Sequence, residues 1–316
     1  MKCSFYATLL IPTLLLTFRP EAQGQVTVPD VYTQHLSRAD SLAAAGDFRQ
    51  SAVFYEKAFA SFGGKGGVAD KYKAAQVYML AGNKDACIQM LMNLCRTGYF
   101  WDHPKVAKDP VFQPMAADPA FLEAVKCIQA SQLKNAPDFN FAWRDMLEAV
   151  TRADQAIRDE LNAAITAGAD NATLSLIMKR MERIDSANTR TVADFLDEHA
   201  WQGPKVIDFS GSRALFLVLV HARLEVQSKY LAMVKEAGRK QWIPPMDVAL
   251  FEDKLSVARD GTQIYGSQLG RDENGQMFLY PIIDEPNVNK RRMALGLEPI
   301  EDYLKLFNLS YPIKKQ

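Results

Sequence analysis

The longest regular pattern of apolar and polar positions lies in the second half of the chain. Over residues 141–167, and again over 173–200, apolar side chains recur every three or four positions with charged side chains between them. This spacing is that of an α-helix with one apolar face. Gly203 and Pro204 follow the second stretch and stop helical continuation. The pattern therefore predicts two long amphipathic helices.

A shorter unit occurs twice in the first half. Residues 45–58 predict a helix end, a tight turn at Gly46 and a second amphipathic helix, and residues 81–91 repeat this order with Gly82 at the turn. The period of about 36 residues is close to the roughly 34 of tetratricopeptide repeats. Residues 25–135 therefore resemble a tetratricopeptide-like helical repeat domain. The resemblance implies a scaffold that binds a protein or peptide partner.

Two Asp-Pro pairs follow this repeat. Each places a helix-capping residue before a proline at the first helical turn, so each predicts the start of a short helix. The pairs are Asp109-Pro110 and Asp118-Pro119. Two repeat units are fewer than the three that usually bury a stable repeat core, so we expect these helices to close it.

The rest of the chain combines helical and strand patterns. Residues 213–237 contain the run 215–220, which is apolar on all sides and predicts a central, buried helix. Strand-favouring segments then flank a turn at Asn274-Gly275, which is a strong hairpin signal. The remaining predicted helices cover residues 245–259, 288–295 and 300–307.

These patterns together predict a mainly α fold. A short tetratricopeptide-like array is followed by a helical domain over residues 136–316, which carries one β-hairpin near 262–283. The first 24 residues are set apart, because one lysine, an apolar run over 7–18 and small residues at 22 and 24 are typical of a secretory signal peptide.

The signal peptide predicts an exported protein, periplasmic or extracellular. Its apolar run is shorter than the roughly 20 residues that cross a membrane, so no membrane span is expected after cleavage. An uncleaved N-terminal anchor is the alternative. The chain carries 37 basic and 37 acidic residues. This balance argues against a nucleic-acid partner, which usually requires a basic excess.

Three cysteines follow the signal peptide, and an exported protein can oxidise them. Cys87 and Cys95 lie on one predicted helix, roughly 12 Å apart along its axis, so they cannot bridge to each other. Cys127 could pair with one of them if its helix packs alongside. Buried free thiols are the favoured alternative.

One histidine is a candidate for acid–base chemistry. His221 lies on the predicted central helix, with Glu225 one turn later. A carboxylate that orients a histidine makes a general base, and Asp253 is a second candidate for the orienting group. An ion pair over a core helix is the alternative. The chain has 4 histidines and no metal-binding spacing among them, so neither a metal nor another cofactor is indicated.

Polar side chains gather near the C-terminus. Gln263, Tyr265 and Gln268 lie within six residues, and Arg291 and Arg292 follow in a predicted helix. Amide and phenol groups this dense are typical of a pocket for a small polar ligand, and guanidinium groups bind anions. The alternative is an arginine–carboxylate clamp that holds the hairpin to the helices.

The order of these residues resembles an uncharacterised bacterial family. Its signature is a His-containing helix, an Asp-Arg or Asp-Lys pair, Q-x-Y-G-[TS]-Q and D-x-R-R-x-x-x-G-L. The matching positions are His221 with Gln227, Asp253-Lys254, and the segments 263–268 and 289–297, except that Asn289 stands where the family favours aspartate. The resemblance covers about residues 140–310 and adds Gln227 to the ligand-binding candidates. It implies a fold and a set of site residues but no reaction.

Three hypotheses follow. The first is an exported binding protein, whose repeat recruits a protein or peptide and whose C-terminal domain binds a small polar or anionic ligand. The second is a hydrolase-type enzyme with His221 as general base, Asp253 or Glu225 as orienting group and Arg291 as anion stabiliser. The third is a purely structural C-terminal domain. Convergence of these side chains in one open cleft would favour a site, and pairing within the core would favour a structural role.

Overall fold

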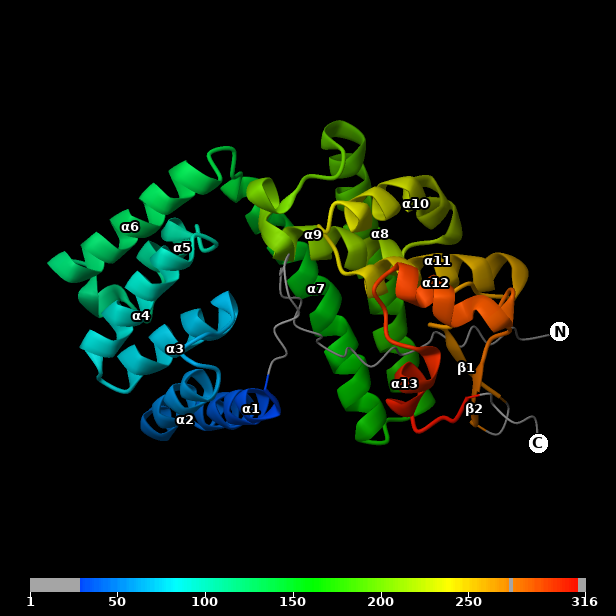
Figure 1. Ribbon diagram of the computed structural model, residues 1–316, viewed down its shortest axis with the longest axis horizontal. Coiled ribbons are helices and arrows are strands. Elements are labelled where there is room, and N and C mark those ends of the chain that lie inside the picture. The colour runs from blue at the N-terminus through cyan, green and yellow to red at the C-terminus, as the bar shows by residue number, and fades with distance from the viewer. Residues whose placement is uncertain (1–28, 273–274, 312–316) are drawn as a thin grey trace. The chain divides into compact units, whose positions relative to one another are not determined.

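The computed structural model describes residues 29–272 and 275–311 (Figure 1). The described chain is mainly α-helical with one two-stranded antiparallel sheet, which confirms the predicted fold class. It divides into two compact units between Phe139 and Asn140. The predicted signal peptide and Asn274 of the predicted turn lie outside the described residues.

The N-terminal unit is a series of helices that pack on one another in chain order. Helix α1 packs on α2, α2 on α3, α3 on α4, and α4 on α6. Gly46 and Gly82 have φ of 80° and 81°, which glycine adopts without strain, at the predicted turns. The elements are α1 (Asp30–Ala44), α2 (Phe48–Ser61), α3 (Val68–Leu80), α4 (Lys84–Thr97), α5 (His103–Lys108), η1 (Gln113–Met115) and α6 (Pro119–Asn135).

Only one of the two Asp-Pro pairs starts a regular α-helix. The Asp118 carboxylate accepts hydrogen bonds from the amides of Ala120 and Phe121 and caps α6 as predicted. Asp109 instead precedes a turn and the short η1, which corrects the prediction. Its carboxylate is held by the Tyr72 hydroxyl at 2.6 Å and the Gln76 amide at 2.8 Å. These tertiary bonds anchor the segment to α3.

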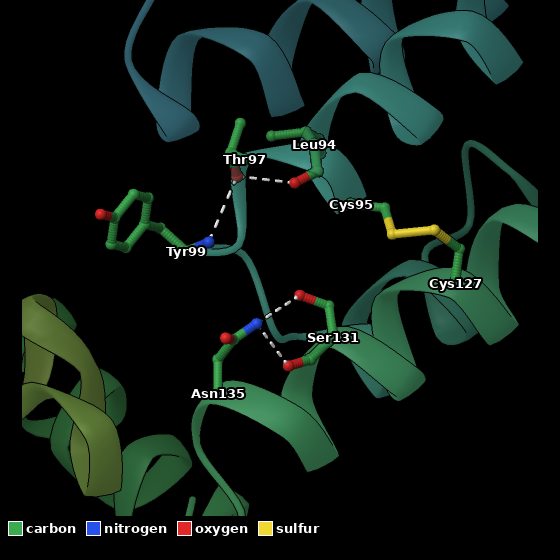
Figure 2. The surroundings of a disulfide bond; sticks show 7 residues. All are labelled: Leu94, Cys95, Thr97, Tyr99, Cys127, Ser131 and Asn135. Carbon is green, nitrogen blue, oxygen red and sulfur yellow. Dashed lines mark hydrogen bonds between the residues drawn. A yellow bond between two sulfur atoms is a disulfide. The ribbon is translucent and has the colours of Figure 1, made fainter.

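A disulfide joins Cys95 on α4 to Cys127 on α6, as Figure 2 shows, with the two Cα atoms 5.9 Å apart. Helix α6 packs along α4 and brings Cys127 opposite Cys95. Cys87 is a buried free thiol. The favoured alternative of three free thiols is therefore wrong for Cys95 and Cys127.

The C-terminal unit is built on two long helices, α7 and α8, which pack side by side, with α9 packed against both (Figure 1). Its elements are α7 (Phe141–Thr166), α8 (Asn171–His199), α9 (Pro204–His221), α10 (Leu224–Arg239), α11 (Pro245–Asp260), β1 (Leu269–Arg271), β2 (Met277–Leu279), η2 (Glu285–Asn287), α12 (Val288–Ala294) and α13 (Ile300–Lys305).

The apolar helix predicted over 213–237 is two helices in the structure. Helix α9 ends at His221, and α10 begins at Leu224. The buried Gln227 side chain donates hydrogen bonds to the carbonyls of Val220 at 3.1 Å and Ala222 at 2.9 Å. These bonds satisfy carbonyls that the helix end leaves without partners. The amide predicted to bind a ligand therefore stabilises the corner after His221.

The hairpin is shorter than predicted. Strands β1 and β2 pair with Leu269 opposite Leu279, and residues 263–268 form a loop that precedes β1. The predicted hairpin is therefore too long at this end, and the segment that contains Gln263, Tyr265 and Gln268 is not part of a strand. The reason is a tertiary interaction of this loop with helix α11.

Candidate functional site

The loop over residues 263–268 wraps around the carboxylate of Asp253. Asp253 lies on α11 with an exposed fraction of 0%. It accepts hydrogen bonds from the backbone amides of Ile264 at 2.6 Å, Tyr265 at 2.9 Å and Ser267 at 2.9 Å, and from the Ser267 hydroxyl at 2.9 Å. Burial raises the pKa of Asp253 above its ordinary value, while the amide bonds oppose this shift.

The two glutamines of this loop bond to the protein itself. The Gln263 amide group donates to the carbonyls of Gln268 at 3.0 Å and Tyr280 at 2.8 Å, and its oxygen accepts from the Gln268 backbone amide at 2.7 Å. The Gln268 side chain donates to the Leu250 carbonyl at 3.3 Å. Both side chains are buried. The amides that predicted a ligand pocket therefore hold the loop together.

Gly266 allows the loop to pass close to α13. Its φ is 78°, and a Cβ at this position would overlap the side chain of Ile300. A larger residue would be strained in the backbone and would also displace Ile300. The close packing of the loop on α13 therefore explains the glycine in the segment 263–268.

The paired arginines extend the same network. Arg292 is 0% exposed and donates to the carbonyls of Glu298 at 2.6 Å and Tyr265 at 2.9 Å. Arg291 donates to the Ile264 carbonyl at 2.9 Å and pairs with the Asp284 carboxylate at 3.2 Å. These contacts join α12 to the loop. They match the predicted clamp more closely than a ligand site.

A second polar cluster surrounds His221, the last residue of α9. Its Nδ1 lies 3.0 Å from the Oδ1 atom of Asp154 on α7, whose side chain is 1% exposed. An ionised carboxylate can only accept, so Nδ1 carries the hydrogen and Nε2 carries the free electron pair. Among the described residues, Nε2 has no hydrogen-bond partner. The side chain is 23% exposed, so it is only partly shielded from solvent.

Arg158 and Gln155 fix the Asp154 carboxylate. Arg158 lies 3.0 Å from Asp154 Oδ1 and reaches across to Asp185 on α8, also at 3.0 Å. Gln155 donates to Asp154 Oδ2 at 2.6 Å. Both carboxylate oxygens are thus bonded, which holds the oxygen that orients His221 in place.

Lys254 brings a further charge to this cluster from α11. Its ammonium group donates to the Val220 carbonyl at 2.5 Å, one residue before His221. Burial lowers the pKa of Lys254 to about 8, and the positive charge of Arg158 contributes to this shift while Asp185 opposes it. Lys254 follows Asp253 directly in sequence, so α11 contributes one residue to each of the two polar clusters.

The surroundings of His221 favour its neutral form. Burial lowers its pKa below the ordinary value of 6.5; the bonded Asp154 raises it, and the charges of Arg158 and Lys254 lower it. A neutral ring with a free Nε2 can take a proton from water or from a substrate hydroxyl. This cluster therefore has the geometry of a general base with an orienting carboxylate.

The comparisons with known proteins locate both polar clusters in one family. Residues 142–316, more than half of the chain, match a family of unknown function, DUF6624. The chain belongs to the DUF6624 family. Asp154, His221 and the loop around Asp253 all lie in the DUF6624 region, whereas α1–α6 precede it. Comparison with curated proteins and with solved structures finds no match.

Two further properties concern the described residues as a whole. Over 29–272 and 275–311, no group of three or more histidines, cysteines or acidic residues is arranged to hold a metal ion. Within the same residues, no helix combines the length and the apolar character needed to cross a membrane.

The two carboxylates that the sequence analysis grouped with His221 have other surroundings in the structure. Glu225 is exposed in the first turn of α10, beyond the break that follows His221, and Asp253 is occupied by loop amides. Asp154, which contacts His221, was missed. The sequence did contain a signal for Asp154. It is a charged residue on the buried face of α7, with Val150 and Ile157 before and after it at helical spacing.

Proposed function

We propose that the C-terminal unit is a hydrolase-type enzyme in which His221 acts as general base. His221 Nε2 would take a proton from water or a substrate hydroxyl, and Asp154 would be a positioning residue that holds the required tautomer. The contact between His221 and Asp154 carries this proposal. It combines a buried carboxylate with a histidine whose side chain is partly exposed.

The loop around Asp253 supports the structural hypothesis for its own residues. Gln263, Gln268 and Arg292 are buried and bonded to backbone carbonyls. A ligand would have to break these bonds before it could form its own, which costs free energy. The polar-ligand pocket proposed for these residues is therefore less favoured than the His221 site.

The proposed reaction is testable with p-nitrophenyl esters and p-nitrophenyl phosphates as a substrate panel. For a substrate that is turned over, His221→Gln is expected to lower kcat/KM about 100-fold, since general-base catalysis contributes at least that factor. The value of kcat/KM should fall with decreasing pH, because protonated His221 cannot accept a proton, and its midpoint, which reports the free enzyme, should lie below 6.5. His35→Gln, in the other unit, is the control. Full turnover by His221→Gln would exclude this role.

The positioning role of Asp154 is tested by a measurement that loss of a purely structural contact would leave unchanged. In spectra of ¹⁵N-labelled histidine rings, we expect the hydrogen of His221 on Nδ1 in the wild type. Asp154→Asn is expected to mix the two tautomers, because its side chain can donate as well as accept. An unchanged tautomer in this variant would contradict the positioning role.

We also propose that the N-terminal unit is a tetratricopeptide-like scaffold for a peptide segment of another protein. A groove of about 370 Å³ supports this, lined by α1, α2 and α3. It presents the ion pair between Lys73 and Asp40 beside the 47% exposed Leu80. Charged and apolar groups side by side suit an extended peptide.

A peptide library displayed on phage tests this groove. Selected peptides are expected to bind the wild type and to lose at least about tenfold in affinity in Leu80→Glu, since apolar contact is replaced by a charge. Leu133→Glu, on the exposed face of α6 outside the groove, is the matched control. Equal binding by both variants would place the peptide elsewhere.

Export of the protein is part of the same proposal. The signal-like pattern of residues 1–24 supports it, and so does the disulfide between Cys95 and Cys127, since disulfides persist mainly in oxidising compartments. Free thiols at both cysteines in protein isolated from cells would contradict export.

A further inference from the structure

We infer that the His221 site binds an oxyanion, the carboxylate or phosphate group of a small substrate, and that Lys254 is its charged partner. This inference rests on the proposed function of His221 and adds the chemical class of substrate. It follows from which charged side chains around His221 have a partner of opposite charge.

Five titratable side chains from four helices form this cluster. The carboxylates of Asp154 and Asp185 are both engaged by Arg158, and Asp154 also holds His221. Among the described residues, no carboxylate lies within 4.0 Å of the Lys254 ammonium group. The cations of this cluster are Arg158 and Lys254, and of these two only Arg158 has a carboxylate partner within the described residues.

The Lys254 ammonium group has unused hydrogen-bonding capacity. It has three donor hydrogens, and within the described part of the chain it makes one hydrogen bond, to the Val220 carbonyl. A partly buried cation without an anion is unfavourable, because the protein replaces its water poorly. A bound oxyanion would accept the remaining hydrogens and neutralise the charge. The pKa of Lys254, lowered to about 8, reflects the same unfavourable environment.

The position of Lys254 places such an anion beside the proposed base. Lys254 bonds to the carbonyl of the residue before His221, and its charge contributes to the lowered pKa of the ring. An oxyanion on Lys254 would oppose that contribution and raise the pKa of His221. The predicted substrate therefore carries its anionic group close to the bond that is hydrolysed with His221 as general base.

The test uses inorganic phosphate and acetate as probes on the full mature chain, with sodium chloride keeping the ionic strength constant. In spectra of labelled histidine rings, at least one probe is expected to shift the His221 signal saturably and to raise its pKa. Lys254→Gln should weaken this binding at least tenfold. Lys254→Arg, which keeps the charge, should retain it, and Lys235→Gln on the exposed face of α10 is the matched lysine control.

The result separates the inference from the proposed function. His221→Gln should still be stabilised thermally by the same anion, because Lys254 remains, although its turnover is lost. No saturable shift with either probe, or equal binding by Lys254→Gln, would overturn the inference and leave the role of His221 standing. Should Lys254→Gln not fold, loss of binding in Lys254→Met with retained helical circular dichroism makes the same distinction.

Discussion

Asp253→Ala is expected to lower the free energy of unfolding by about 3–5 kcal/mol. The variant removes the only carboxylate that the loop amides of Ile264, Tyr265 and Ser267 bond to among the described residues. Each buried donor left without an acceptor costs about 1–3 kcal/mol, and water can satisfy only part of this loss. The cavity left by the side chain adds to the effect.

Urea denaturation followed by circular dichroism measures this loss. Ser267→Ala removes one of the bonds to Asp253 and leaves the amides satisfied, so it should cost only about 1 kcal/mol. Asp302→Ala, on the exposed face of α13, should change stability by less than about 0.5 kcal/mol. A loss below about 1 kcal/mol for Asp253→Ala would show that the loop does not depend on this carboxylate.

Removing the disulfide is expected to destabilise the N-terminal unit by about 3–4 kcal/mol. Cys95 and Cys127 are separated by 32 residues, and linking them restricts the unfolded chain over this length. Cys95→Ala with Cys127→Ala lifts that restriction and leaves α4 and α6 held by their non-covalent contacts. The same change should follow reduction with dithiothreitol.

Differential scanning calorimetry resolves this effect, because it reports a unit that unfolds separately. Cys87→Ala is the matched control: it removes a buried thiol from the same helix without opening the bond. Its melting temperature should fall less than that of the double variant, and it should still respond to dithiothreitol. Identical melting of the wild type with and without reductant would show that the bond contributes nothing to stability.

Local sequence patterns predicted the helices well. The three- and four-residue spacing of apolar positions gave α7 and α8, and Asp118 marked the start of α6, because these signals act within one or two turns. The same reasoning overextended the strands around residues 262–283. The amides of residues in this region could pair in a sheet, but in the structure the loop amides donate to Asp253, which lies on α11.

The candidate site was predicted only in part. His221 was identified, but its partner was sought one helical turn away at Glu225, and the helix ends before that turn. Its contact with Asp154 spans 67 residues and depends on how α7 and α9 pack. Periodicity could indicate that Asp154 occupies a buried position, but it could not indicate which side chain lies opposite.

The adjacency of Asp253 and Lys254 has a consequence for how this unit tolerates mutation. Successive residues of a helix point in different directions, so Asp253 of α11 bonds to the loop while Lys254 bonds to the Val220 carbonyl, next to His221. A substitution in the loop that tilts or rotates α11 would also move the ammonium group beside the base. Loop variants are therefore expected to be epistatic with Lys254, although no loop side chain hydrogen-bonds to its ammonium group among the described residues.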